Sequence, residues 1–203
     1  HIEVQIFGDG QGRVMALGQL VRLAASVQPR YLLLAAPHRT LFFAGLSSLL
    51  AASVWWGLHI VARYTGAPLF ALALQPAPLW AHAWLMLFAV LPTMFFGFLF
   101  TVFPRWMNGP LVTRTEYLTT AALFAAGTLL WLAGTFAGPT LLLAGCIATG
   151  AGLLVGTAAL FRVLLAAQQV VPHAVVVLTA LCVQLVALAG FALGVGTQND
   201  FAL

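Results

Sequence analysis

Charged residues are scarce in this sequence, and lysine is absent. Only 6% of the 203 residues are charged, eight of them arginine and four acidic, whereas 63% are hydrophobic. A soluble domain needs many charged and polar side chains on its surface, and this chain has too few of them. Its surroundings must therefore be mostly lipid. We therefore expect a lipid bilayer and no nucleic acid as partner, with the small basic excess reporting on membrane topology.

The motifs of common hydrolytic and phosphoryl-transfer enzymes are also missing. The chain has no Ser-His-Asp order, no paired carboxylates, no phosphate-binding loop and no metalloprotease helix motif. No carboxylate falls in the middle of an apolar run, which argues against an ion pathway through this chain alone. Cys146 and Cys182 both lie in apolar runs, and we interpret them as packing residues. We assign no catalytic residue, and whether the chain is an enzyme stays open.

Long apolar runs dominate what is present. Crossing a hydrocarbon core of about 30 Å takes about 20 helical residues. Five runs reach that length: residues 41–62, 79–103, 117–136, 139–167 and 174–196. They predict an all-α, polytopic transmembrane bundle over residues 37–203. Pro92, inside the second run, is expected to kink its helix. Gly152 and Gly156, and likewise Gly190 and Gly194, are spaced to let helices approach closely.

Residues 1–36 are expected to form a cytoplasmic or interfacial segment before the bundle. Ile2, Val4 and Ile6 alternate with polar residues, as in a strand, and "GDGQG" is typical of a turn. From Met15 onward, apolar residues recur at helical spacing, which indicates an amphipathic helix. The sequence therefore predicts a strand, a turn and an amphipathic helix. Residue 1 is histidine, so we interpret the chain as processed or as a fragment.

Arginine placement predicts the orientation. If the N-terminus is cytoplasmic, seven arginines lie on the inner side: Arg13, Arg22, Arg30, Arg39, Arg105, Arg114 and Arg162. Only Arg63 then lies outside. Because basic residues concentrate in cytoplasmic segments, this asymmetry predicts a multi-pass protein with a cytoplasmic N-terminus.

The histidines fall at two depths. His59 lies three residues before the end of the first run and His82 three residues after the start of the second, so both sit near the outer surface. His38 and His173 precede the first and fifth runs, near the inner surface. Neutral imidazole binds haem iron or copper, so we predict two metal-ligand pairs. Arg63, one turn beyond His59, is placed to pair with a haem propionate. Alternatively, these histidines bond only to headgroups and water.

Several motifs resemble a known family. "APHRTLFFAG" leads into the first run, "WWGL" follows within it, "GFLFTVFPRWMNG" closes the second, and "LLWLAGT" lies in the third. Over about residues 29–196 the pattern resembles NnrS, a bacterial family of polytopic membrane proteins that contain haem and copper and are associated with nitric oxide stress and denitrification. The resemblance implies haem b and copper as cofactors, a place in the bacterial inner membrane, and about twice as many helices as this chain holds.

The sequence departs from the family pattern at three positions. The family typically has a histidine and then a glutamate where this chain has Trp84 and Leu85, and an arginine in place of Thr135. Two functions therefore stay open. In the first, the chain binds haem or copper through His59 and His82 and handles nitric oxide or electrons. In the second, it is a structural or accessory subunit that has lost the metal site and packs against other membrane subunits or copies of itself.

Overall fold

Five long apolar helices make up most of the structure, a computed structural model that describes residues 6–8, 14–16, 32–66 and 76–196. In this part of the chain, five helices are long and apolar enough to cross a membrane. They are α3 (Pro37–Thr65), a second span made of α4 (Pro78–Trp84), η2 (Leu85–Val90) and α5 (Leu91–Trp106), then α6 (Arg114–Ala137), α7 (Pro139–Leu165) and α8 (Pro172–Gly196). The predicted all-α bundle of five spans is confirmed.

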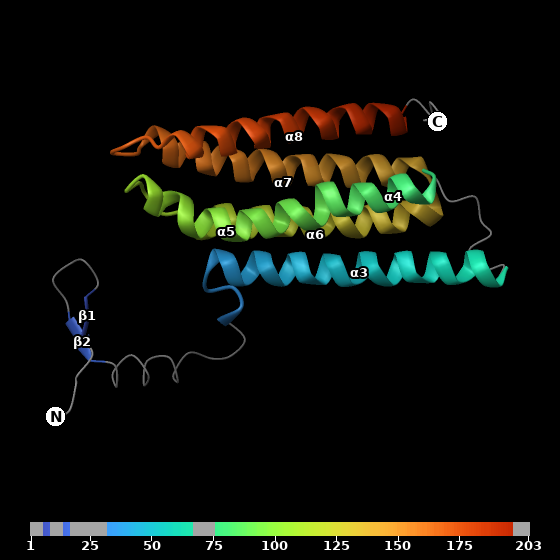
Figure 1. Ribbon diagram of the computed structural model, residues 1–203, viewed down its shortest axis with the longest axis horizontal. Helices are drawn as coiled ribbons and strands as arrows, with labels where there is room; N and C mark the ends of the chain where they lie inside the picture. Colours follow the sequence, from blue (N-terminus) through green and yellow to red (C-terminus); the bar gives the residue numbers. More distant parts are fainter. Residues whose placement is uncertain (1–5, 9–13, 17–31, 67–75, 197–203) are drawn as a thin grey trace.

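The helices lie side by side, with α3 along one edge of the bundle and α8 along the opposite edge (Figure 1). Helices α6 and α7 form an antiparallel hairpin around Gly138 and make the most extensive contact, while α3 packs on α5, η2 and α6. The most apolar stretches of α3 and α8 are only 28% and 22% buried, against 56% for the second span. The two edge helices therefore present most of their surface to lipid or to further protein.

The segment before the bundle differs from the prediction. Ile6–Gly8 (β1) pairs antiparallel with Val14–Ala16 (β2), with Phe7 opposite Met15. Met15, predicted to open an amphipathic helix, thus lies in a strand. A short apolar run is compatible both with the spacing of a helix and with the alternation of a strand. The predicted strand–turn–helix order is not supported. Residues 9–13 and 17–31, which would hold the turn and most of that helix, lie outside the described residues.

Proline and a capping box set where the helices begin. Pro37, Pro78 and Pro139 stand in the first turn of α3, α4 and α7, where a missing N–H is harmless and the fixed φ suits a helix. At the start of α6, the Thr113 side chain accepts from the Glu116 N–H, and the Glu116 carboxylate accepts from the Thr113 N–H. These signals start α3 and α6 ahead of their apolar runs, at Pro37 and Arg114 instead of residues 41 and 117, whereas α7 begins at Pro139 as its run does.

Pro92 changes the hydrogen bonding of the second span. The preceding turn, η2, is π-helical, and the Leu91 N–H donates to the Met86 carbonyl five residues back. The Leu87 carbonyl would next accept from residue 92, but proline has no N–H. Instead, Gln184 of α8 donates its side-chain Nε2–H to Leu87 O at 2.8 Å. The predicted loss of a backbone hydrogen bond at Pro92 is present, and a side chain of another helix satisfies the carbonyl that it leaves free, while the predicted kink stays a prediction.

Glycine allows the α6–α7 hairpin to close. A Cβ on Gly145 would come within 2.9 Å of the Trp131 backbone nitrogen, and one on Gly134 within 2.6 Å of the Leu142 nitrogen. Gly156, predicted as a packing glycine, makes room for the Phe96 ring, which a Cβ would meet at 2.6 Å. The prediction is wrong for Gly190, where a Cβ would find nothing within 4 Å.

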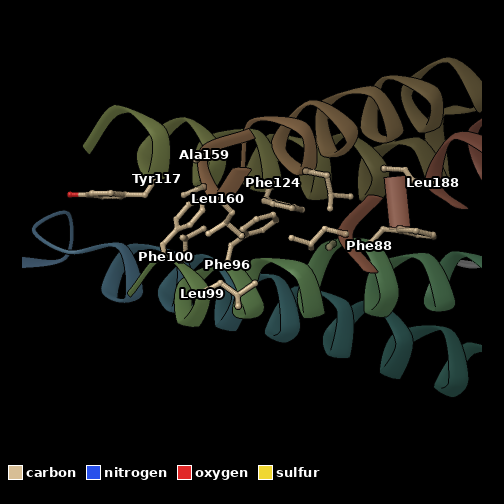
Figure 2. Packing of buried hydrophobic residues seen from close by; sticks show 14 of the residues in the cluster. Phe88, Phe96, Leu99, Phe100, Tyr117, Phe124, Ala159, Leu160 and Leu188 are labelled. Atoms are coloured by element: carbon tan, nitrogen blue, oxygen red, sulfur yellow. The ribbon is translucent and has the colours of Figure 1, made fainter. Parts of the chain in front are cut away.

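An aromatic core joins α5, α6 and α7 (Figure 2). The Phe96 ring centroid lies 5.2 Å from that of Phe100 and 5.8 Å from that of Phe124, and all three side chains are buried together with Leu160. Tilted rings at these distances attract through their quadrupoles as well as by burial. This core fixes α5 against the α6–α7 hairpin and so positions both ends of the bundle.

Candidate functional site

His59 and His82 meet at the same tryptophan. The Trp56 ring stacks on His82 with centroids 4.4 Å apart and on His59 at 5.6 Å, while Trp55 stacks on His59 at 6.0 Å. The last turns of α3 carry three of these rings and the first turns of α4 carry His82. We call this end of the bundle the histidine end, defined by His59 and His82.

Both imidazoles have a buried nitrogen without a partner. The Nδ1 atoms of His59 and His82 are shielded and make no hydrogen bond within the described chain, although each residue is only partly buried as a whole. A buried polar atom that stays unpaired is costly, so such atoms usually have a partner. Stacking covers ring faces, whereas a metal binds an imidazole nitrogen at the ring edge. The arrangement therefore leaves one nitrogen at the edge of each ring without a partner among the described residues.

Polar side chains around the two histidines are few. Among the described residues, no group of three or more histidine, cysteine, aspartate or glutamate side chains is placed to hold a metal ion. Arg63, predicted to pair with a propionate, is exposed in the last turn of α3. A metal held here by side chains of this part of the chain would thus have His59 and His82 as its ligands.

The positions that depart from the family pattern lie in an apolar layer beside the histidines. Trp84 and Leu85 are fully buried, and Trp84 stacks on Trp131 with centroids 4.1 Å apart. Thr135 accepts a hydrogen bond from Trp55 Nε1–H at 3.2 Å. Cys146 is buried next to Trp84, as expected for a packing residue. This layer is an aromatic contact between α4 and α6.

Cys182 is exposed on α8 as far as the described residues go, whereas Cys146 is buried; both are free cysteines. The prediction that both cysteines are packing residues is therefore not supported for Cys182 within the described residues.

The second predicted pair, His38 and His173, does not meet. His38 Nδ1 lies 3.5 Å from Thr101 Oγ1, and the His173 ring packs edge-on against Trp106 at 4.5 Å. Thr101 and Trp106 are five residues apart on α5, which places them about 140° apart around that helix. Each histidine therefore faces a different side of α5, and a shared metal between them stays an untested prediction that this arrangement does not favour.

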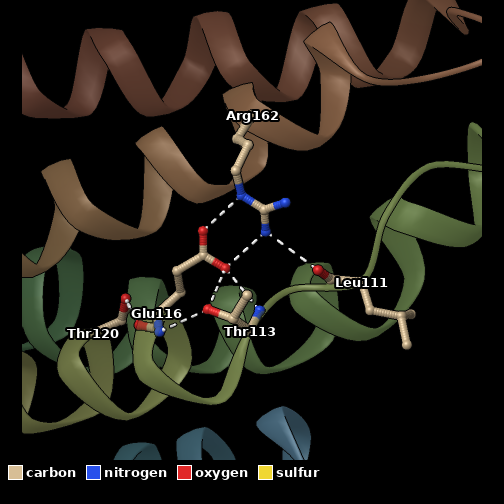
Figure 3. A network of polar contacts seen from close by, with 5 residues as sticks. All are labelled: Leu111, Thr113, Glu116, Thr120 and Arg162. Carbon is tan, nitrogen blue, oxygen red and sulfur yellow. Dashed lines mark hydrogen bonds and ion pairs between the residues drawn. The ribbon is translucent and has the colours of Figure 1, made fainter.

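An ion pair at the other end of the bundle was missed by the sequence analysis. Figure 3 shows Glu116 of α6 accepting from Arg162 of α7, from Nε–H to Oε1 at 2.8 Å and from an Nη–H to Oε2 at 2.7 Å. Arg162 also donates to the Leu111 carbonyl, and Thr113 donates to the carboxylate. Two signals point to it: a Thr-x-x-Glu capping box, and the equal depth of Glu116 and Arg162 on antiparallel helices.

Four arginines of the described chain gather at that same end, which we call the arginine end: Arg39, Arg105, Arg114 and Arg162. Arg63 alone lies at the histidine end. The spans thus separate a basic end from an end that carries two histidines and several tryptophans.

Comparisons with known proteins agree with the motifs quoted above. A search of curated proteins and a search of solved structures give no significant match. A family model described as "NnrS protein" matches residues 32–203, which is most of the chain and contains all five apolar helices. This multi-pass membrane protein belongs to the NnrS family.

Proposed function

We propose that this protein binds a transition-metal centre, haem b or copper, at the histidine end and acts in the response to nitric oxide or in electron transfer. The observation that carries the proposal is the pair of buried Nδ1 atoms of His59 and His82, which have no partner among the described residues. Imidazole suits both iron and copper, so the donor set fits either centre.

Each residue at the histidine end has a distinct part in this proposal. Trp56 holds the plane of His82, because stacked rings at 4.4 Å restrict rotation about the side chain. His59 and His82 would hold the metal at a ring edge. Arg63 is charged and exposed at the same end, where it would pair with a propionate if the centre is haem. When bound, the metal would supply a site for nitric oxide or for one-electron transfer.

The proposed orientation follows from the arginines. The arginine end, with four of the five arginines of the described chain, would face the cytoplasm of a bacterial inner membrane. The histidine end would then face the opposite side. The proposed metal centre would therefore lie near the outer surface, and the N-terminus in the cytoplasm.

A second candidate function is that of an accessory subunit without a metal. The observation in its favour is the fully buried Trp84 stacked on Trp131, at a position where the family typically has a polar residue. A tightly packed aromatic layer can replace a polar site and keep the scaffold. In that case α3 and α8, the least buried helices, would pack against other membrane subunits or a second copy.

Absorbance and copper analysis of the purified protein test the first proposal. The full chain is expressed in bacteria supplied with haem precursor and copper, then purified in detergent. We expect a Soret band or bound copper in the wild type, and a loss of most of it in both His59→Ala and His82→Ala, because each removes one of two ligands. Tyr64→Ala, an exposed residue in the last turn of α3, is the control and should keep the metal.

Two results would contradict metal binding by this pair. Metal that persists in both alanine variants would remove His59 and His82 as ligands. A wild type with neither a Soret band nor copper would favour the accessory function, which co-purification of a membrane partner with the intact chain would then test. Far-UV circular dichroism and size-exclusion chromatography of each variant show whether it still folds.

A further inference from the structure

An apolar groove lies between α3 and α6, in the half of the bundle nearer the arginine end. Its volume is about 530 Å³. It is lined mainly by small and apolar side chains, among them Thr40, Phe43 and Ser47 of α3 and Leu118, Ala122 and Ala125 of α6. The groove lies within two apolar membrane spans, so in a bilayer an apolar occupant must fill it.

Three of the hydroxyls that line the groove, those of Thr40, Ser48 and Thr128, are engaged within the protein. Thr128 donates to the Phe124 carbonyl at 2.9 Å, so Ser48 is the donor in the 3.3 Å bond between its hydroxyl and that of Thr128. Thr40 donates to the Leu33 carbonyl at 2.9 Å. These three hydroxyls therefore leave the groove apolar in character, which suits a hydrocarbon chain better than a polar ligand.

The groove runs along the helix axes. From Thr40 to Ala51 of α3 the chain rises about 16 Å. An acyl chain is long, thin and apolar, so it can lie along a groove of this length and lining.

Two arginines without a carboxylate partner in the described residues lie near the arginine end of the groove; Arg39 donates to the Leu32 carbonyl at 3.4 Å. Arg114 lies one turn before Leu118 on α6, and Arg39 lies one turn before Phe43 on α3, so each precedes a lining residue by four positions. Both are exposed. Within the described chain the one ion pair is that of Glu116 and Arg162, so no carboxylate neutralises either cation there.

The two helix starts lie at the same level. Tyr117, in the first turn of α6, donates its hydroxyl to the Leu34 carbonyl at 2.8 Å, just before α3 begins. The start of α3, which has no acidic residue in its first turn, and the two arginines therefore lie at the same end of the bundle, whereas Glu116 already caps the start of α6. A phosphate at that surface would be attracted by the start of α3 and by both arginines.

We propose that the α3–α6 groove binds an anionic phospholipid, with one acyl chain in the groove and the phosphate between Arg39 and Arg114. The apolar lining suits a hydrocarbon chain, and the two arginines, which have no carboxylate partner in the described residues, suit a negative headgroup. The site is independent of the metal proposed at the histidine end.

Native mass spectrometry of the full chain tests this site. The delipidated protein is titrated with phosphatidylglycerol or with phosphatidylcholine of the same acyl chains, which separates the headgroup from the tail. We expect phosphatidylglycerol to bind more tightly, and Arg114→Gln to lower that preference by about fivefold, in line with the attraction of one arginine near a charged headgroup. Arg114→Lys should keep most of it.

Matched variants separate this site from general membrane contact. Arg105→Gln removes an exposed arginine of the same end that belongs to α5, which contributes no lining residue to the groove, and should leave the preference unchanged. Ala122→Leu should fill the groove and weaken the binding of both lipids. Ala133→Leu, at an exposed position of α6 beyond the groove, should weaken the binding of neither.

Three outcomes would overturn the proposal. They are equal binding of the two lipids by the wild type, an equal effect of Arg105→Gln and Arg114→Gln, and an intermolecular disulfide formed by Ser47→Cys in native membranes, which would place a second copy on the groove. Circular dichroism of each variant confirms that a lost preference does not come from unfolding.

Discussion

Replacing Gly145 by alanine tests whether the α6–α7 hairpin depends on backbone contact. A Cβ at this position would lie 2.9 Å from the Trp131 nitrogen and 3.1 Å from the Gly127 carbonyl oxygen. Both neighbours are backbone atoms, so no side chain can rotate away. The two helices must separate by about half an ångström to reach ordinary contact distance.

The expected destabilisation is the balance of two opposing effects. Overpacking in a tight interior costs about 1–3 kcal/mol, because the helices lose contact along the interface. Replacing glycine by alanine in a helix contributes up to about 1 kcal/mol in the other direction. We therefore expect Gly145→Ala to lower the free energy of unfolding by about 1–2 kcal/mol.

Gly150→Ala is the matched control on the same helix. There a Cβ would meet only Leu188 Cδ2 at 3.6 Å, an ordinary contact, so we expect unchanged or slightly higher stability. Reversible unfolding in mixed micelles with increasing sodium dodecyl sulfate, followed by ellipticity and tryptophan fluorescence, measures both variants. If Gly145→Ala proved as stable as Gly150→Ala, the close approach of α6 and α7 would not contribute to stability and the reasoning would fail.

Two further substitutions test polar contacts between helices, with the same unfolding assay. Glu116→Gln should lower stability by about 1–2 kcal/mol, because Arg162 loses a bidentate carboxylate partner at a partly exposed site. Gln184→Leu should lower stability by about 1 kcal/mol, because the Leu87 carbonyl loses its donor from α8 in an apolar environment. Thr179→Val, whose hydroxyl bonds only to its own helix, should change stability by less.

Arg105→Gln is the control for the ion pair. It removes an exposed arginine of the same end without breaking an ion pair in the described chain, so stability should change little. An equal effect of Glu116→Gln and Arg105→Gln would mean that only net charge matters at this end.

The length of the apolar runs was enough to predict the number of spans, and less reliable for their ends. The first and third runs begin at residues 41 and 117, but the helices begin at Pro37 and Arg114. Hydropathy counts only apolar residues, whereas a helix continues through the polar interface until a proline or a capping box marks its start.

Depth along the membrane could be predicted from the sequence, and rotation about each helix could not. His59 and His82 share a depth, and the structure brings both to Trp56. His38 and His173 share a depth too, yet they face different sides of α5. In lipid the outward face is as apolar as the inward face, so no periodicity tells which side of a helix meets its neighbour.

The π-helical turn η2 changes the rotation of the second span, so that the residues after the turn face a different direction than a continuous α-helix would give them. One extra residue in a helical turn rotates everything after it by about 100° relative to a continuous α-helix. His82 before the turn and Phe96 after it therefore follow separate registers along one membrane-spanning rod. The extra residue thus lets one continuous helix present His82 to the α3 tryptophans and Phe96 to the aromatic core, an angular relation that an unbroken α-helix of the same sequence would not give.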